Sequence, residues 1–248
     1  MSNEASYSVT RRGDGPIAVF TIDRPGRANA LSHNVIDGLL ATLHDLPAGC
    51  DALLISGSAT VFSAGADLGC VAGECGDSRP VQQLLDRLIE AIETAPFPVA
   101  VLYEGPCVGA AVELSLACDV RLATLRGSLR IPATEIGTVY RAQGIENLAR
   151  RLSPPALQSM LVMGDRIPAT RAQAWGLLEV FGDGEAAKDE LTDKIARINR
   201  NPGTFADQKT CLRNVINAQQ LPEQARVAVT AIREAREAHK NDRAKVGS

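Results

Sequence analysis

Short apolar runs alternate with longer amphipathic segments through the first half of the chain, and this alternation limits the possible folds more than any other feature. A short apolar run bounded by turn residues is typical of a buried strand, whereas apolar residues three or four positions apart indicate a helix. Strands that alternate with helices need crossover connections, so we expect an α/β fold. The pattern predicts two strands in the first 25 residues, on either side of 13–15, of which the second is 17–22. Further strands are predicted at 52–56, 99–103 and 120–123, and helices at 32–46, 81–95 and 108–117.

The second half of the chain has a mainly helical pattern after Pro154. Its last segment, 222–240, is highly charged and carries only a thin apolar stripe, and a helix of this kind is usually stabilised by packing on a neighbour. We place a domain boundary near residue 200, between a core of residues 1–200 and a helical region of residues 201–248. The remaining helices are predicted at 155–163, 169–175, 185–199 and 205–218.

Charge and hydropathy argue against several classes of partner. The formal net charge is only −3 and no Lys/Arg run occurs, so we expect no nucleic-acid binding. No apolar stretch approaches the ~20 residues of a membrane helix, and the first residues lack the apolar core of a signal peptide. We therefore expect a cytoplasmic protein without a membrane partner.

The cysteines and histidines give no motif that predicts a disulfide or a metal site. The six cysteines show no Cys-x-x-Cys spacing, so in a reducing compartment we expect free thiols that mainly pack. The three histidines, His33, His44 and His239, do not lie near a cysteine–carboxylate cluster in the sequence, and each falls in a helical pattern. We therefore expect neither a metal ligand set nor a Ser-His-Asp triad.

Two segments rich in glycine and alanine, 61–68 and 104–113, each follow a predicted strand. Small residues where a strand passes into a helix let a ligand approach the main chain, and the first N–H groups of the helix point outward. Two such junctions that face each other would bind one carbonyl oxygen and stabilise an enolate. The alternative is that these small residues only permit tight packing.

Four motifs in order across residues 15–180 resemble the enoyl-CoA hydratase/isomerase (crotonase) family. The segment 23–31, DRPGRANAL, resembles an early signature of that family, and 62–68 and 98–123 resemble its two oxyanion loops. The alanine-rich segment 169–178 resembles the helix and turn that follow. Each motif alone is weakly specific, and four in sequence are a strong indication.

This resemblance implies a crotonase-like spiral of ββα repeats with a C-terminal helical oligomerisation region that forms trimers or dimers of trimers. It implies an acyl thioester substrate, on CoA or a carrier protein, with no tightly bound cofactor. It also implies that the N–H groups of Ala66 and Ala110 form an oxyanion hole. Arg27 and Ala28 would lie along the CoA, and Ala64 and Leu68 near its adenine. Ala110 stands where the family usually has glycine, and the family's C-terminal phenylalanine–basic–proline motif is not visible in 240–248.

The catalytic side chains implied by the resemblance differ from those of a hydratase. Hydratases of this family use two glutamates, of which the first matches Glu113 and the second falls on Ala133, and alanine moves no proton. The loop 137–148 looks most like the methylmalonyl-CoA decarboxylase branch, in which a tyrosine, here Tyr140, orients the carboxylate that is lost. Arg141 would recruit the anionic substrate.

Other interpretations stay open at this stage. The chain would be a hydratase or isomerase if Glu113 acted alone, with water, or with Glu135. It would be a thioester-binding subunit if the chemistry was lost with the second glutamate. Independently of these functions, Tyr140 would be an ordinary half-buried aromatic residue whose hydroxyl caps a turn, and Arg141 a surface charge or phosphate contact. We interpret Asp67 as a brace of the first loop and Cys107 as a packing residue.

Overall fold

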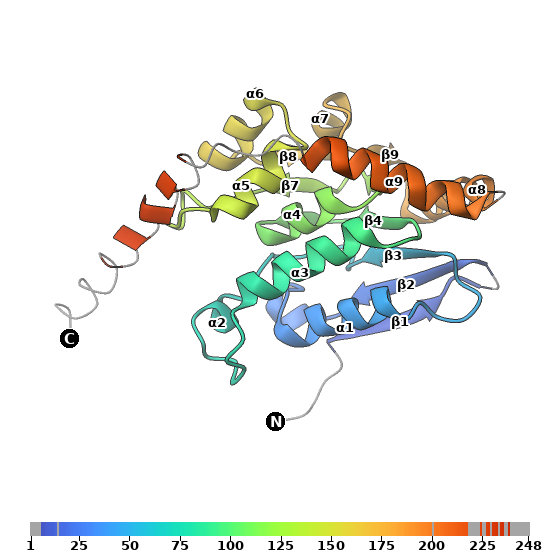
Figure 1. The fold of residues 1–248 in the computed structure, drawn as a ribbon, viewed down its shortest axis with the longest axis horizontal. Coiled ribbons are helices and arrows are strands. Elements are labelled where there is room, and N and C mark those ends of the chain that lie inside the picture. The colour runs from blue at the N-terminus through green and yellow to red at the C-terminus, as the bar shows by residue number, and fades with distance from the viewer. Residues whose placement is uncertain are drawn as a thin grey trace.

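A twisted sheet runs through the middle of the molecule, with helices on both of its faces (Figure 1). The computed structural model describes residues 6–13, 15–199 and 201–217, together with scattered helical positions between 224 and 238. Within these residues the sheet has the order β1-β2-β3-β4-β6-β9, and all neighbours are parallel except β1 and β2. Its strands are β1 (Tyr7–Arg11), β2 (Ile17–Ile22), β3 (Ala52–Ser56), β4 (Val99–Tyr103), β6 (Val120–Thr124) and β9 (Glu179–Phe181).

The central strands are buried on both faces, which explains why they are apolar at nearly every position. Alternate side chains of a strand point to opposite faces, so Leu53 and Ile55 of β3 face one layer of helices while Leu54 faces the other. The first layer consists of α1 (His33–His44), α3 (Val81–Thr94) and α4 (Ala110–Ala117). The second contains α8 (Gly184–Ile198).

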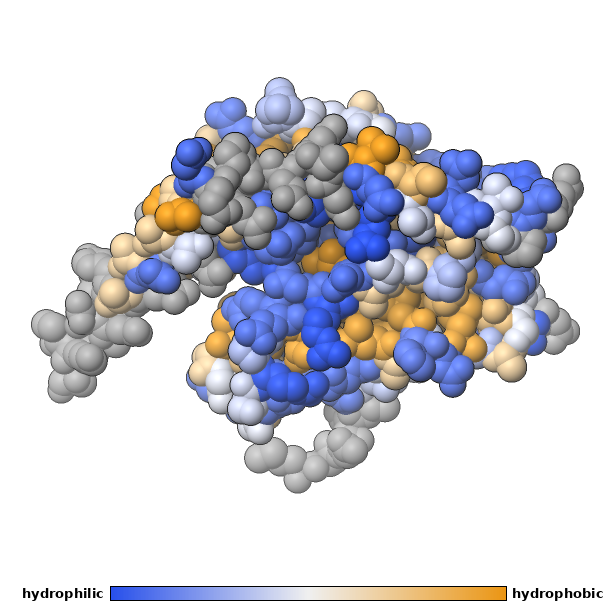
Figure 2. All heavy atoms as spheres, viewed as in Figure 1, coloured by the Kyte–Doolittle hydropathy of each residue, from blue (hydrophilic) through white to orange (hydrophobic). Residues whose placement is uncertain are grey.

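The outer surface of the first layer is mixed in character. Figure 2 shows hydrophilic side chains over much of this face, with hydrophobic surface visible in the hollows between them. Ser32 caps the N-terminus of α1, because its hydroxyl accepts a hydrogen bond from the N–H of Val35 at 3.5 Å.

A second, smaller sheet lies beside the first and completes a repeating strand–strand–helix unit. It consists of β5 (Pro106–Val108), β7 (Ser128–Arg130) and β8 (Ile167–Pro168). The chain passes from β4 to β5 to α4, and from β6 to β7 and on to α5 (Ala142–Ala149). This repetition is the expected spiral of ββα units. The helix predicted from residue 108 begins at Ala110 instead, because residues 106–108 pair with β7.

Several elements of the second half differ from the predicted ones. The helix expected at 155–163 is α6 (Pro154–Leu157) followed by a wider helical turn, η2 (Gln158–Val162). The helix expected at 169–175 is α7 (Ala169–Ala174). The sequence pattern did not predict the small sheet or β9. It also did not predict three short helical elements, η1 (Pro25–Arg27), α2 (Leu68–Val71) and α5.

Helix α9 (Pro202–Asn217) begins the C-terminal region and docks against the body of the protein. The ammonium of Lys209 lies 2.7 Å from a carboxylate oxygen of Asp119 and donates to the carbonyl of Ile92 at 2.9 Å. The helix predicted at 222–240 falls largely outside the described residues, although the positions described there are helical. The boundary near residue 200 and the oligomerisation role stay predictions.

Cys70 and Cys75 form a disulfide, which corrects the expectation that all six cysteines are free thiols. The two residues flank a tight turn after α2, and this turn brings their Cα atoms to 4.8 Å, a separation that a disulfide can span. Cys50, Cys107, Cys118 and Cys211 are free. Among the described residues, none of the helices combines the length and apolar character needed to cross a bilayer.

Candidate active site

The two glycine- and alanine-rich loops pair with each other along their backbones. Ser63 and Cys107 form a parallel bridge, and the N–H of Val108 donates to the carbonyl of Ser63 at 2.9 Å. Ala66 and Ala110 each lie three residues beyond this bridge. The two alanines therefore have the same register on neighbouring segments.

Gly65 permits the closest approach between the loops. Its φ is +87°, and a Cβ at this position would lie 2.5 Å from the carbonyl oxygen of Val108 and 2.9 Å from the amide nitrogen of Ala110. No side chain larger than hydrogen fits there without a shift of the backbone. The amide of Ala110, the first residue of α4, thus lies directly beside the loop that carries Ala66.

The amides of Ala66 and Ala110 are not used in the internal hydrogen bonds of the described residues. Leu31 pairs with the first loop by accepting from the N–H of Asp67 at 3.1 Å and donating to the carbonyl of Gly65 at 2.8 Å. This pairing passes over the N–H of Ala66, and Ala110 is at the start of its helix, where the N–H has no intrahelical partner. Both amides remain available to a ligand.

A cavity of about 280 Å³ collects most of the predicted site residues. Seven of the nine line it, whereas Arg27 and Ala28 do not, although the carbonyl of Ala28 accepts from the N–H of Ala64 at 2.9 Å. The volume suits an acyl group better than a complete cofactor-sized molecule. The predicted residues in the wall are Ala64, Ala66, Leu68, Ala110, Glu113, Tyr140 and Arg141, and the other wall residues include Gln82, Leu85, Val108, Ile131, Pro132, Ala133, Ile136, Thr138 and Val139.

Glu113 projects into this cavity from the first turn of α4 and is buried. Its Oε1 accepts from Arg141 at 2.6 Å and from the side-chain amide of Asn147 at 2.9 Å. Burial raises the pKa of Glu113 from 4.5 to about 7, while the hydrogen bond from Asn147 and the charge of Arg151 oppose the rise. A carboxyl in this range exchanges a proton readily near neutral pH.

Arg141 is a largely enclosed bridging residue, so its interpretation as a surface charge is wrong, whereas a phosphate contact stays a prediction. Its side chain is only 12% exposed, and its guanidinium forms ion pairs with Glu113 and with Asp86 of α3. These two carboxylates hold the guanidinium at the cavity wall. Arg141 thereby connects α3, α4 and the start of α5.

Tyr140 lies next to Glu113, and its hydroxyl is buried without a protein partner among the described residues. A Cβ on Gly144 would lie 2.8 Å from the Tyr140 ring and 3.0 Å from Oε2 of Glu113, so the glycine leaves room for both groups. Burial and the nearby Glu113 carboxyl raise the pKa of Tyr140 well above its usual value. The hydroxyl therefore stays protonated and can donate a hydrogen bond to a ligand in the cavity.

Ala133 lines the cavity and is buried, whereas Glu135 points away from it. The Glu135 side chain is 51% exposed and forms an ion pair with Arg130. The hypothesis that Glu135 serves as a shifted second carboxylate is therefore wrong. Among the cavity-lining residues that the structure describes, Glu113 is the one carboxylic acid.

The structure also decides two smaller interpretations. Asp67 caps α2 through the N–H of Gly69 at 3.1 Å and pairs with Arg24 at 2.9 Å, which confirms it as a brace of the first loop. Cys107 is fully buried, and burial raises the pKa of its thiol, which confirms a packing role.

The sequence interpretation missed Asn147 and Asp86. Asn147 lies inside the motif 137–148, and its place in that motif was the available signal.

Comparisons with known proteins agree with this geometry. Residues 12–244 match the family model described as enoyl-CoA hydratase/isomerase. A probable enoyl-CoA hydratase of Bacillus subtilis is 29% identical over 196 residues, which are 77% of this chain and 76% of that protein. The alpha subunit of a Shewanella fatty acid oxidation complex is 30% identical over 71% of this chain, and the match spans 26% of the subunit. A structure of methylmalonyl-CoA decarboxylase with 2S-carboxypropyl-CoA superposes with a TM-score of 0.82 at 24% identity, covering 95% of this chain and 91% of that one.

Proposed function

The chain belongs to the enoyl-CoA hydratase/isomerase family of acyl-CoA enzymes, and from this premise we propose that it is a carbon–carbon lyase that decarboxylates a malonyl-type acyl thioester. The observation that carries the proposal is the composition of the cavity wall. A single carboxyl, Glu113, faces an apolar wall in which Ala133 stands where hydratases of the family have their second glutamate. Addition of water by two carboxylates has no second partner here.

Decarboxylation matches this wall because it needs no base. The bond between the α-carbon and the carboxylate breaks, its electron pair passes into the thioester as an enolate, and CO₂ leaves. The amides of Ala66 and Ala110 bind the enolate oxygen, and one such donor contributes about 3 to 4 kcal/mol to transition-state stabilisation. An apolar wall favours the reaction further, because the carboxylate loses its charge as it departs.

Tyr140 and Glu113 divide the remaining tasks. The hydroxyl of Tyr140, which has no protein partner, donates a hydrogen bond to the substrate carboxylate and turns it out of the plane of the thioester. Glu113, with a pKa of about 7, supplies the proton that the α-carbon takes up afterwards, directly or through water. Arg141 holds Glu113 in place, and Asp86 holds the guanidinium from its other side.

The carrier of the acyl group leaves the cavity past the wall residues Ala64 and Leu68 and continues along Arg27 and Ala28. The side chain of Leu68 is 69% exposed at the rim, as expected for an apolar residue that a ligand covers. We assign CoA as the carrier within the substrate, with a carrier-protein thioester as the alternative, and no tightly bound cofactor. A cytoplasmic trimer or dimer of trimers remains the expected form.

Purified protein incubated with methylmalonyl-CoA and with crotonyl-CoA tests the proposal. We expect release of CO₂ from the first and no hydration of the second. Tyr140→Phe should lower kcat for CO₂ release by about 10²-fold, because the carboxylate loses its orienting contact. Tyr103→Phe is the matched control, since Tyr103 is fully buried in β4 outside the cavity. Hydration without CO₂ release, or binding without any turnover, would contradict a decarboxylase.

A second function is favoured by the pKa of Glu113. One buried carboxyl that titrates near neutral pH is sufficient to move a proton between C2 and C4 of an enoyl thioester, so a double-bond isomerase is the alternative. With 3-enoyl-CoA as substrate, Glu113→Gln would then abolish conversion to 2-enoyl-CoA, while Glu135→Gln would leave it unchanged. Wild-type protein that converts 3-enoyl-CoA and releases no CO₂ establishes the isomerase instead.

A further inference from the structure

The surroundings of the disulfide contain a histidine that is positioned as a metal ligand. One ring nitrogen of His33 and the sulfurs of Cys70 and Cys75 all lie within 4.8 Å of one another. The sequence separates the histidine from the cysteines by more than thirty positions, which is why spacing alone predicts no metal site. We propose that, once the disulfide is reduced, Cys70, Cys75 and Nδ1 of His33 bind a zinc ion.

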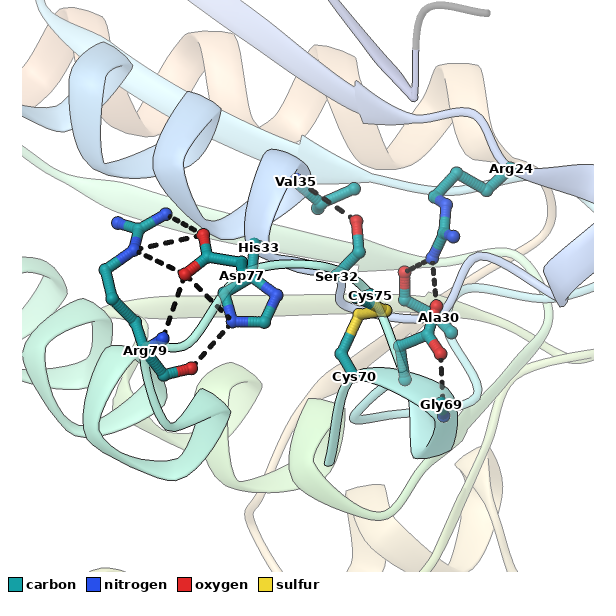
Figure 3. Close-up of a disulfide and its surroundings, with 11 residues drawn as sticks. Arg24, Ala30, Ser32, His33, Val35, Gly69, Cys70, Cys75, Asp77 and Arg79 are labelled. Carbon is teal, nitrogen blue, oxygen red and sulfur yellow. Dashed lines mark hydrogen bonds and ion pairs between the residues drawn. A yellow bond between two sulfur atoms is a disulfide. The ribbon is translucent and has the colours of Figure 1, made fainter. Parts of the chain in front are cut away.

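Three elements bring these side chains together (Figure 3). His33 is the first residue of α1, Cys70 lies in α2, and Cys75 is in the turn that leads to α3. The backbone bridge between Leu31 and Ala66 fixes the start of α1 beside the loop that enters α2. The arrangement therefore results from the main-chain pairing of the two loops and does not depend on the disulfide alone.

The ring of His33 is held with a lone pair available. Its Nε2 is 2.8 Å from the carbonyl oxygen of Arg79, and a carbonyl only accepts, so the proton of the neutral ring is on Nε2. The His33 side chain is only 8% exposed, and its buried Nδ1 has no hydrogen-bond partner among the described residues. In Figure 3 this nitrogen lies on the side of the ring toward Cys75.

The contacts on the opposite edge of the ring are those that zinc-binding histidines usually have. A metal-bound histidine typically donates its other N–H to a carbonyl or carboxylate, which fixes the ring and raises the basicity of the ligating nitrogen. Here Nε2 faces the Arg79 carbonyl, and an oxygen of Asp77 lies 3.9 Å away on the same side. Asp77 is thus a partner of the ring and not a fourth ligand.

The distances suit zinc after the sulfurs separate. With Zn–S bonds of ~2.3 Å and Zn–N bonds of ~2.0 Å in a tetrahedral site, ligand atoms lie roughly 3.5 to 3.8 Å apart. The present separations of up to 4.8 Å are close to this, so small side-chain rotations complete the site. Cys75 is exposed, so water has access to the fourth position.

Conversion of the disulfide into a metal site requires a thiol reductant, which supplies the electrons and protons. A dithiol transfers two electrons and two protons to the Cys70–Cys75 bond, giving two thiols and the oxidised, cyclic form of the reductant. Zn²⁺ then displaces the two thiol protons and leaves two metal-bound thiolates. The disulfide ties α2 only to its own turn, whereas the metal also ties this segment to α1.

Cobalt and zinc binding to the full-length protein test the proposal. Protein reduced with a dithiol, and separated from it without air, is titrated with Co²⁺ while the thiolate-to-cobalt absorption is followed. Competition with a chromogenic chelator then gives the zinc affinity. We expect one metal ion per chain in the reduced protein, none in the oxidised protein, and a higher Tm with zinc only after reduction.

Variants identify the ligands. Cys70→Ser, Cys75→Ser and His33→Gln should each weaken binding at least about tenfold, because each removes one ligand. Cys211→Ser and His44→Gln are matched controls, since Cys211 is a free exposed cysteine and His44 lies at the far end of α1. Circular dichroism verifies the fold of each variant, and the exposed Cys75 is the replacement least able to disturb packing.

Four results would overturn the proposal. The first is equal metal binding by oxidised and reduced protein, and the second is loss of binding in Cys211→Ser. The third is unchanged affinity and unchanged cobalt absorption in folded His33→Gln. Failure of the reduced protein to bind either metal at micromolar concentration would overturn it as well.

Discussion

Replacing Gly65 with alanine is expected to disable the site far more than it destabilises the fold. Gly65 has a φ of +87°, and an added Cβ would lie 2.5 Å from the Val108 carbonyl oxygen. Ordinary contact distances begin near 3.4 Å, so the two loops must separate by about 1 Å. A displacement of this size in an active site typically costs about 10²-fold in rate. Loss of one oxyanion donor costs about 10² to 10³-fold in kcat.

Gly176→Ala separates this effect from simple backbone strain. Gly176 also has a positive φ, +72°, but nothing lies within 4 Å of its missing Cβ, and it follows α7 outside the cavity. Each alanine should lower the free energy of unfolding by about 1 to 2 kcal/mol, because both force a side chain into the left-handed region. The clash with Val108 is found only at Gly65.

The assay combines urea unfolding with steady-state turnover of the thioester that the wild-type protein accepts. We expect the Gly65→Ala variant to lose at least about 10²-fold in kcat, and the Gly176→Ala variant to stay within about threefold of wild type. Equal kcat values for the two folded variants would show that the junction of the loops is not where the reaction occurs. The proposed convergence of the two amides would then be wrong.

Three other perturbations test the energetics of the site and its surroundings. Raising the pH from 4.5 to 7 should lower the stability of the wild type relative to Glu113→Gln by at most about 3 kcal/mol. The pKa of Glu113 is higher in the folded than in the unfolded protein, so its contribution to stability is present below the unfolded-state pKa and is lost as the pH rises through the folded-state pKa. Urea unfolding at several pH values measures this loss. Ala133→Glu should increase hydration of crotonyl-CoA, which is measured as the loss of enoyl absorbance. The buried carboxyl should lower the free energy of unfolding by about 1 to 3 kcal/mol. No gain in hydration would show that this wall position does not face the substrate. Lys209→Met should destabilise the fold by about 1 to 3 kcal/mol, because it removes the ammonium partner of the partly buried Asp119 carboxylate. Lys188→Met breaks an exposed pair and should cost about 1 kcal/mol or less. Equal denaturation midpoints for the two variants would contradict docking of α9 through the Lys209 contact.

The main sheet is the part of the fold that local sequence determines most directly. Strands β2, β3 and β4 coincide with the predicted runs at 17–22, 52–56 and 99–103. A parallel strand covered on both faces must be apolar at nearly every position, so composition and structure agree there. The short strand β5 was absorbed into a predicted helix because its pairing with β7 is a long-range contact that no local pattern reports.

The site was predictable where main-chain geometry defines it and unpredictable where distant side chains meet. The loops around Ala66 and Ala110 carry a local signature of small residues. Of the partners of Glu113, Asn147 comes from α5, a helix that begins at Ala142, contains Gly144 and has no strong helical signal. The proximity of His33 to Cys70 likewise depends on the pairing of loops far apart in sequence.

The shared register of the two loops has a consequence for how the site can diversify. Because the segments around Ser63 and Cys107 are joined by peptide-to-peptide hydrogen bonds, the spacing of the amides beyond them is set by backbone dimensions that every sequence shares. Substitution of side chains in these loops therefore leaves the spacing of the two amides intact, whereas the chemistry proposed for residues 133 to 141 of the cavity wall depends on the side chains themselves.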